Sequence, residues 1–194
     1  MGNGMISRKL IHYLSTQDDL SNTLVMVMWS GSDRYEVFFD YEKDILPDFT
    51  STNHIDNTGR WLMLSGGKVS NSTWCKRYYR DYYSYWQGKV TTYEHILRTQ
   101  WYLKSRNIDY VMLTFMDEVL KEEDKHPQLA HLWDMFDHSK FIRPGHYDYN
   151  MNSRIPFGKD SHGDTDYHPV PEMSRLYTQD VILPYLRAEK FLPE

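Results

Sequence analysis

The sequence predicts an α/β domain built on a parallel sheet. Two segments, TLVMVMW (residues 23–29) and NIDYVMLTF (residues 107–115), have the length and apolar character of buried strands. A helical pattern lies between them, and two strands joined through a helix usually run parallel. At 194 residues, the chain is long enough to bury a proper core and is expected to form a single domain over residues 1–194.

The segment before the first strand predicts a helix. Apolar side chains within residues 5–14 follow helical spacing, which places a helix from Gly4 to Ser15. The strand itself is apolar without alternation, so we expect it to be buried on both faces. SGSDR follows at residues 30–34. Its small residues and its aspartate stand at the carboxyl end of the strand, where ligands bind in open α/β sheets.

The remaining elements are predicted from spacing, prolines and glycines. Residues 35–71 predict an irregular excursion with a short strand at 61–64, and residues 73–106 a helical stretch that breaks near Gln87 and Gly88. An acidic loop or short helix follows at 117–125. We then expect a helix at 127–136, a short strand within 139–145, a long polar loop at 145–163, and a last helix from Pro171 to Ala188.

Composition excludes several classes of function. The net charge of −5 argues against a nucleic-acid binder that works by neutralising phosphates. The longest strongly apolar stretch, Leu24–Trp29, is too short to cross a bilayer, and the first residues lack the hydrophobic region of a signal peptide. We therefore expect neither a nucleic acid nor a membrane as partner. The single cysteine, Cys75, excludes an internal disulfide and sits among bulky residues, which favours a packed thiol.

The segment HGDTDYHPVP, residues 162–171, carries the clearest catalytic pattern. Asp166 stands two residues before His168, just ahead of the last helix. In many hydrolases such a histidine takes the proton of a nucleophile while the aspartate orients the imidazole ring. A polar turn that only starts the helix is the simpler alternative.

A metal site is a second alternative for this segment, built from His162, Asp164, Asp166 and His168. Every-second-residue spacing points such ligands along a line instead of toward one ion, so we expect no metal and no other cofactor. The other histidines show no spacing that suggests a role, and are expected on the surface or in packing: His12, His54, His95, His126, His131, His138 and His146.

Three segments together resemble the SGNH hydrolase family, in particular the SGNH-like proteins of phages and environmental viruses. DYHPVPEMSRLY (166–177) is similar to the last block of the family, WSGSDR (29–34) to the block after the third strand, and GNGMISRK (2–9) to the glycine-bearing block. The resemblance implies a flavodoxin-like three-layer fold with a parallel sheet, and hydrolysis of acyl or acetyl esters, for example on carbohydrates.

The resemblance also implies roles for individual residues. His168 would be the general base and Asp166 its orienting carboxylate. Gly4 with Asn3 or Ser32 would bind the oxyanion, beside Ser30 and Asp33 in the same substrate-binding site. The family places an oxyanion-binding asparagine where this chain has Ser32, whose hydroxyl donates from a shorter arm. Losing such a donor typically costs a hundredfold or more in rate.

The nucleophile is the second departure from the family. The family begins with a strand that ends in a Gly-Asp-Ser turn carrying the nucleophile, and this chain starts after that point. We therefore expect the first strand of the sheet to be missing, which should leave a gap in the core. Three explanations stay open: a second chain or another copy of this chain supplies the strand, the sequence is a fragment of a longer protein, or the domain is degenerate and no longer an esterase. Ser7, Ser30 and Ser32 are the serines that remain as substitutes, and Ser32 is the candidate.

Two functions follow from these observations. The first is an SGNH-type esterase or deacetylase. The second is a non-catalytic module of a viral particle or assembly, consistent with the 16 tyrosines and 6 tryptophans, which suit an interaction surface as well as a core. Either would work in the cytoplasm of a host cell or on a virion.

Overall fold

The computed structural model describes residues 2–38, 61–64, 73–120, 126–152, 157–159, 165–166 and 169–193. Its central sheet has three parallel strands in the order β1–β4–β5. The strands are β1 (Leu24–Trp29), β4 (Asp109–Thr114) and β5 (Phe141–Ile142). β1 and β4 pair along their full length, from Leu24 opposite Asp109 to Trp29 opposite Thr114. The prediction of a parallel sheet with both long strands is confirmed.

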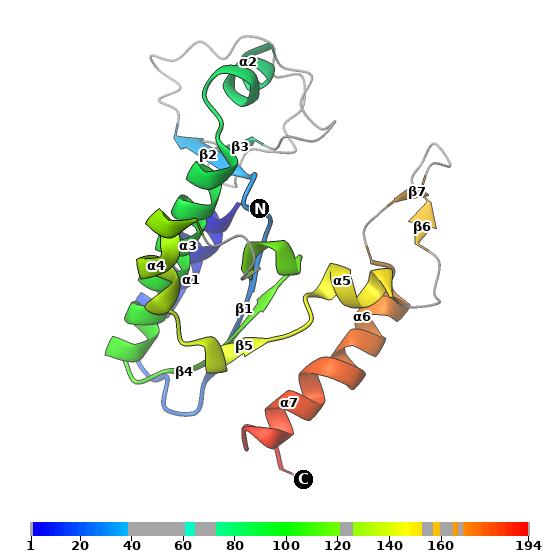
Figure 1. Ribbon diagram of the computed structural model, residues 1–194. Coiled ribbons are helices and arrows are strands. Elements are labelled where there is room, and N and C mark those ends of the chain that lie inside the picture. The colour runs from blue at the N-terminus through cyan, green and yellow to red at the C-terminus, as the bar shows by residue number, and fades with distance from the viewer. Residues whose placement is uncertain are drawn as a thin grey trace.

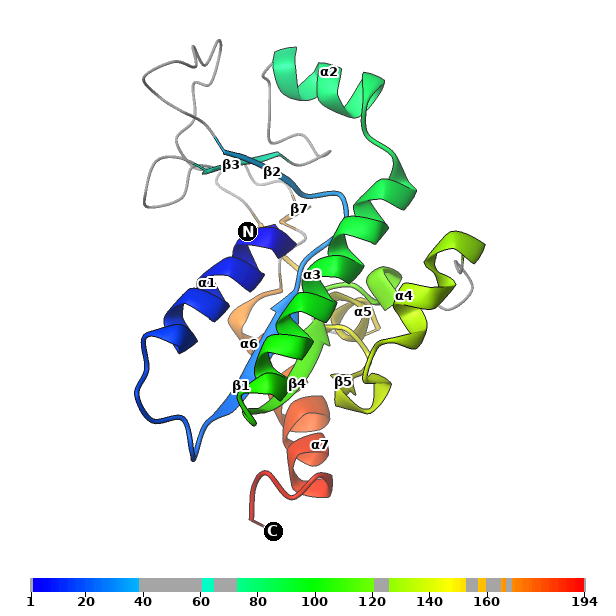
Figure 2. The same ribbon diagram turned by 90° about the vertical axis from the view of Figure 1, so that its left-hand side faces the viewer.

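Helices cover the sheet on both faces (Figure 1). One layer consists of α1 (Asn3–Ser15), α3 (Tyr85–Ser105) and α4 (Ala130–Asp134), and α1 packs against α3 (Figure 2). The other layer consists of α5 (His146–Met151), α6 (Pro171–Tyr177) and α7 (Leu183–Ala188). The result is a three-layer α/β fold of the flavodoxin-like kind, as the sequence predicts.

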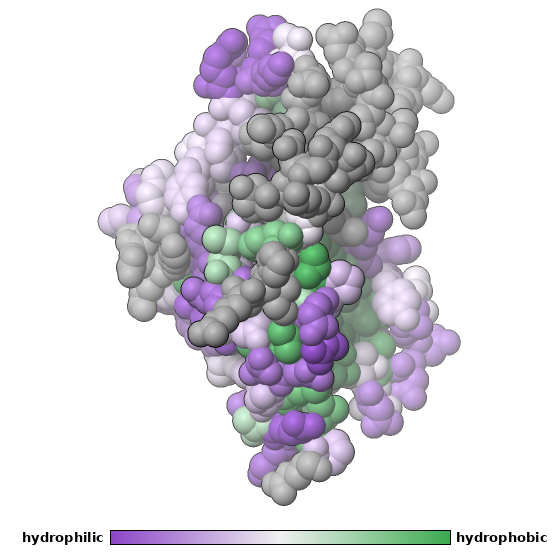
Figure 3. Space-filling model, turned by 90° about the vertical axis from the view of Figure 1, so that its right-hand side faces the viewer, coloured by the Kyte–Doolittle hydropathy of each residue, from purple (hydrophilic) through white to green (hydrophobic). Residues whose placement is uncertain are grey.

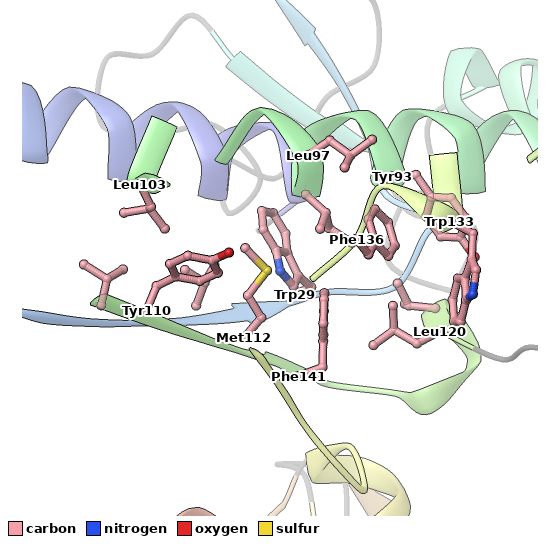
Figure 4. Packing of buried hydrophobic residues seen from close by; sticks show 14 of the residues in the cluster. Trp29, Tyr93, Leu97, Leu103, Tyr110, Met112, Leu120, Trp133, Phe136 and Phe141 are labelled. Atoms are coloured by element: carbon pink, nitrogen blue, oxygen red, sulfur yellow. The ribbon is translucent and has the colours of Figure 1, made fainter. Parts of the chain in front are cut away.

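The main core lies between the sheet and the first helical layer. Trp29, Tyr110 and Met112 point from β1 and β4 toward Leu97 and Leu103 of α3 (Figure 4). A smaller cluster fills the other face, where Val111, Leu113 and Ile142 meet Tyr177 and Leu186. Because β4 is buried on both faces, it is the central strand of the described sheet.

β1 differs from the strand that the sequence predicts, because only one of its faces is buried. Val25, Val27 and Trp29 are buried, whereas Met26 and Met28 are 43% and 38% exposed. The expectation of burial on both faces is wrong for β1: no described helix lies over these two methionines closely enough to bury them. Figure 3 shows this side of the molecule, where apolar atoms reach the surface between polar ones. Within the described residues, no strand pairs with the outer edge of β1.

The predicted helix break is also misplaced. α2 (Thr73–Asp81) ends where Tyr82 N and Tyr83 N both donate to Tyr78 O, and α3 begins after Ser84, whose backbone is extended. Gly88 lies inside α3 instead of breaking it. A Cβ at Gly88 would lie 2.4 Å from the Ser32 carbonyl oxygen, so glycine is required there by a close approach of the turn after β1.

The last helical segment runs from α6 to α7 through a π-helical stretch at Thr178–Ile182. Pro184 is the second residue after this stretch, and proline lacks the N–H that would bond four residues back. The wider π-helical turn therefore falls where the regular hydrogen-bond pattern cannot continue. The predicted helix over 171–188 is confirmed, with this local irregularity.

The smaller elements complete the described chain. Two short antiparallel pairs are β2 (Tyr35–Phe38) with β3 (Trp61–Leu64), as predicted near residue 61, and β6 (Gly158–Lys159) with β7 (Thr165–Asp166). Turns of 3-10 helix lie at Asp117–Leu120, Pro127–Leu129 and His138–Lys140.

Candidate functional site

The start of α1 is fastened to the carboxyl end of β1 by one side chain. Asn3 Oδ1 accepts a hydrogen bond from Ser30 N at 2.7 Å, and Asn3 Nδ2 donates to Ser30 O at 3.1 Å. In a parallel ladder, the N–H and C=O of one residue point to the same side. Phe115 N donates to Trp29 O, so Trp29 faces β4 and Ser30 faces the outer edge. Asn3 therefore takes the place of a neighbouring strand beside Ser30.

The carboxamide of Asn3 is fully engaged within the protein. Nδ2 also donates to Thr92 Oγ1 of α3 at 3.1 Å, and the side chain is buried. One amide thus links α1, β1 and α3. This arrangement favours a positioning role for Asn3, because a donor to a substrate oxyanion would have to leave one of these bonds.

Glu36 of β2 occupies the N-terminus of α1. Its Oε1 accepts from Met5 N at 2.8 Å, and its Oε2 accepts from Arg8 Nη2 at 2.7 Å. A Cβ at Gly2 or Gly4 would lie 2.5 or 2.7 Å from these carboxylate oxygens. The two glycines thus let an anion approach the positive end of the helix. The predicted oxyanion-binding end of α1 holds a carboxylate of the protein itself.

A small cavity that opens to solvent lies beside this junction. Its lining residues come from α1, the turn after β1, β2 and the α2–α3 region: Asn3, Ser32, Arg34, Tyr35, Tyr78, Tyr83, Gln87, Gly88, Thr91, Thr92 and His95. Tyr35 and Tyr78 stack with ring centroids 4.7 Å apart. Burial raises the pKa of Tyr78 to about 12, so this wall is aromatic and uncharged.

His95 lines this cavity from α3. Burial, with Arg98 and Arg8 nearby, lowers its pKa to about 4, so the imidazole is neutral. Its Nε2 lies 3.0 Å from the position of a Cβ on Gly4, which places it against the start of α1.

From sequence, His95 is expected only on the surface or in packing. The signal was a polar stripe at helical spacing: Gly88, Thr91, Thr92 and His95 share one face of α3. Within the helix itself, no feature of this polar face indicates a ligand site. The face points to a site only because the turn after β1 packs against it.

The three candidate serines differ in their access to the cavity. Ser32 lines the cavity. Ser30 is 7% exposed and its backbone is bonded to Asn3. Ser7 is fully buried, and its Oγ accepts from Arg98 Nε at 3.0 Å and from Thr99 Oγ1 at 2.8 Å. Asp33 holds the turn, because its carbonyl oxygen accepts from Tyr79 Oη at 2.5 Å. Of the three serines, Ser32 has the access that a nucleophile needs.

The predicted general base lies outside the described residues. His162, Asp164 and His168 belong to 160–164 and 167–168, and Asp166 is described only as a backbone position in β7. Among the side chains that are described, no group of three or more His, Cys, Asp or Glu residues is arranged to hold a metal ion. Cys75 is buried and packs against Leu64, which agrees with a packed thiol.

None of the helices in the described part of the chain combines the length and hydropathy that a bilayer span requires. Comparison with family models, with curated proteins and with solved structures finds no match to this chain.

Proposed function

We propose that this chain is an SGNH-type ester hydrolase that removes acyl or acetyl groups, with carbohydrate esters among its substrates. The observation that carries the proposal is the Asn3–Ser30 junction. It joins the two sequence blocks that resemble the glycine-bearing and strand-end blocks of the family, next to a cavity lined by Ser32 and His95.

In this proposal, His168 acts as general base and Asp166 orients its ring, as the family resemblance implies. The Ser32 hydroxyl faces the substrate as nucleophile or as a donor to the oxyanion. The rings of Tyr35 and Tyr78 give the cavity a flat, uncharged surface against which a sugar ring can stack. His95, held neutral, is a further hydrogen-bonding group in the same cavity.

Hydrolysis of p-nitrophenyl acetate by the full chain tests the proposal. We expect turnover above that of heat-denatured protein, and a loss of about a hundredfold or more in His168→Ala and Ser32→Ala. His12→Ala, on an exposed position of α1, is the matched control and should keep the wild-type rate. Absence of ester turnover in the wild type, or a His168→Ala rate equal to it, overturns the proposal.

The outer edge of β1 supports a second candidate function, a non-catalytic module that assembles through sheet pairing. The backbone groups of Met26 and Met28 point away from β4, since they alternate with those of Val27 and Trp29. Their side chains are exposed on one face. We propose that a strand of a second copy pairs with this edge, within an assembly such as a viral particle in the host cytoplasm.

Sedimentation velocity distinguishes this second candidate. Wild-type protein should form a dimer at micromolar concentration, and Met28→Lys should shift it to monomer, because a charge on an edge strand opposes pairing. Met151→Lys, which changes an exposed methionine of α5, is the control. A wild type that stays monomeric over the whole concentration range excludes self-pairing.

A further inference from the structure

A serine and a histidine meet on the other side of the sheet from α1 and α3. Ser174 Oγ of α6 lies 3.3 Å from His146 Nε2, the first residue of α5. Both side chains are half-buried. The pair lies near the carboxyl end of β4, the central described strand, and is separate from the residues that line the cavity beside β1.

The turn that carries His146 is anchored to β4 by several hydrogen bonds. Tyr147 N donates to Phe115 O at 2.7 Å, directly after the strand. Asp117 and Asp148 then bond across the turn. Asp117 Oδ1 accepts from Gly145 N at 2.8 Å, and Asp148 Oδ2 accepts from Asp117 N at 2.6 Å. His146 is therefore presented on a fixed backbone, as a general base must be.

The helix α6, which carries Ser174, is held against this turn by Tyr177. Tyr177, one turn further along α6, donates from Oη to Pro144 O at 2.9 Å. Its ring packs on the imidazole of His146 at 4.8 Å between centroids. The Tyr177 side chain thus holds α6 against the turn that carries His146 through two contacts.

The chemical state of the pair suits proton transfer. Burial lowers the pKa of His146, so its imidazole is neutral at pH 7 and can accept a proton from a hydroxyl. Two fully buried polar atoms nearby, Thr114 Oγ1 and Asn150 Oδ1, have no hydrogen-bond partner within the described residues. Buried polar atoms are rarely left unpaired without a ligand, water or function to explain them.

We propose that Ser174 and His146 form a nucleophile–base pair for acyl transfer from esters. This inference rests on the proposed ester hydrolysis and adds a second nucleophile–base pair, separate from Ser32 and His168, at residues to which the sequence patterns assign no role. Ser174 Oγ attacks the ester carbonyl carbon, and the Oγ–H proton passes to His146 Nε2. The ester C–O bond breaks, and the alcohol leaves with that proton. Water then hydrolyses the acyl-serine by the same transfers, which returns the serine and releases the acid.

A fluorophosphonate reagent, which phosphonylates activated serines, tests the pair on the full chain. Mass spectrometry of peptides should find the label on Ser174. His146→Gln should slow labelling by about a hundredfold. Ser105→Ala, which removes an exposed hydroxyl on α3, should label as the wild type does. Circular dichroism of each variant confirms that it is folded. In the wild type, labelling should also fall when acid protonates His146.

The outcomes separate this inference from the proposed function. Ester turnover that is abolished by His168→Ala but unchanged by Ser174→Ala, with label on Ser32, overturns the Ser174–His146 pair and leaves ester hydrolysis standing. Label on Ser174 that His146→Gln does not slow overturns the role of His146. No label on any serine and no ester turnover overturn both proposals.

Discussion

The side chain of Asn3 replaces a strand beside Ser30, bonding both the N–H and the C=O of that residue at 2.7 and 3.1 Å. The outer edge of β1 is unpaired before Ser30 within the described residues, and the candidate site lies directly after Ser30. Residues before Ser30 on the same edge, Met26 and Met28, have no such partner among the described residues. Asn3 therefore sets the position of the turn that carries Ser32 into the cavity.

The first prediction concerns this bridge. Asn3→Ala leaves the buried N–H and C=O of Ser30 without partners, which should lower the free energy of unfolding by about 2–3 kcal/mol. Urea denaturation measures the change. His12→Ala, on an exposed part of the same helix, should leave stability unchanged. If Asn3→Ala unfolds at the same urea concentration as the wild type, water replaces the amide with no loss in the free energy of unfolding.

The second prediction concerns the contact between Gly88 and the Ser32 carbonyl. A Cβ at residue 88 would lie 2.4 Å from that oxygen, which is backbone and cannot swing aside. We expect Gly88→Ala to destabilise by about 1–3 kcal/mol, although alanine favours helices. Thermal unfolding should show a midpoint lower by several degrees. Gln87→Ala, exposed on the same turn of α3, is the control. A higher midpoint in Gly88→Ala would show that the turn moves freely.

The strands and the long helices could be predicted from the sequence because their signals are local. The run LVMVMW is apolar over the length of a strand, and the segment from Pro171 to Ala188 has a proline start and helical spacing. The exposure of Met26 and Met28 could not be predicted, because it depends on which elements cover β1. Local apolarity is the same for a central strand and for an edge strand.

The candidate site was predicted only in part, for a similar reason. Asn3, Ser30 and Ser32 were singled out in two short blocks, and the structure brings these blocks together. His95 and His146 were passed over because their partners lie far away in sequence: the start of α1 for His95, and Ser174 for His146. Gly88 was taken as a helix breaker because only the packed turn explains it.

The third prediction concerns pH. The pKa of His95 is about 4 in the folded chain and 6.5 when unperturbed. As pH falls through 6.5 the unfolded chain binds a proton, but the folded chain does so only near 4. Stability is therefore lost between these values. Between pH 7 and pH 4, the free energy of unfolding of His95→Gln should fall by about 1–2 kcal/mol less than that of the wild type. Solvent screening at a partly exposed ring keeps this below the full pKa difference.

Urea denaturation at both pH values measures this difference. His12→Gln, which alters an exposed histidine of α1, should follow the wild type. Parallel stability curves for His95→Gln and the wild type would mean that His95 accepts its proton as readily in the folded chain as in the unfolded chain.

The last prediction concerns the carboxylate at the start of α1. The Glu36 side chain is 6% exposed, and its carboxylate serves both Met5 N and Arg8 Nη2. Arg8 also lies over the Trp61 ring, 3.6 Å from its centroid. Glu36→Gln removes the charge that matches both the guanidinium and the helix end. We expect a loss of about 2 kcal/mol in the free energy of unfolding, because Arg8 is partly exposed and is not left fully buried without a partner.

A double-mutant cycle with Arg8→Gln separates the ion pair from the helix end. The ion pair should give a coupling of about 1 kcal/mol, and the helix-end effect should remain in the Arg8→Gln background. The exposed pair Arg80 and Asp81 is the control, and Asp81→Asn should not change stability measurably. If Glu36→Gln is as stable as the wild type, the charge of the carboxylate contributes nothing at the helix end.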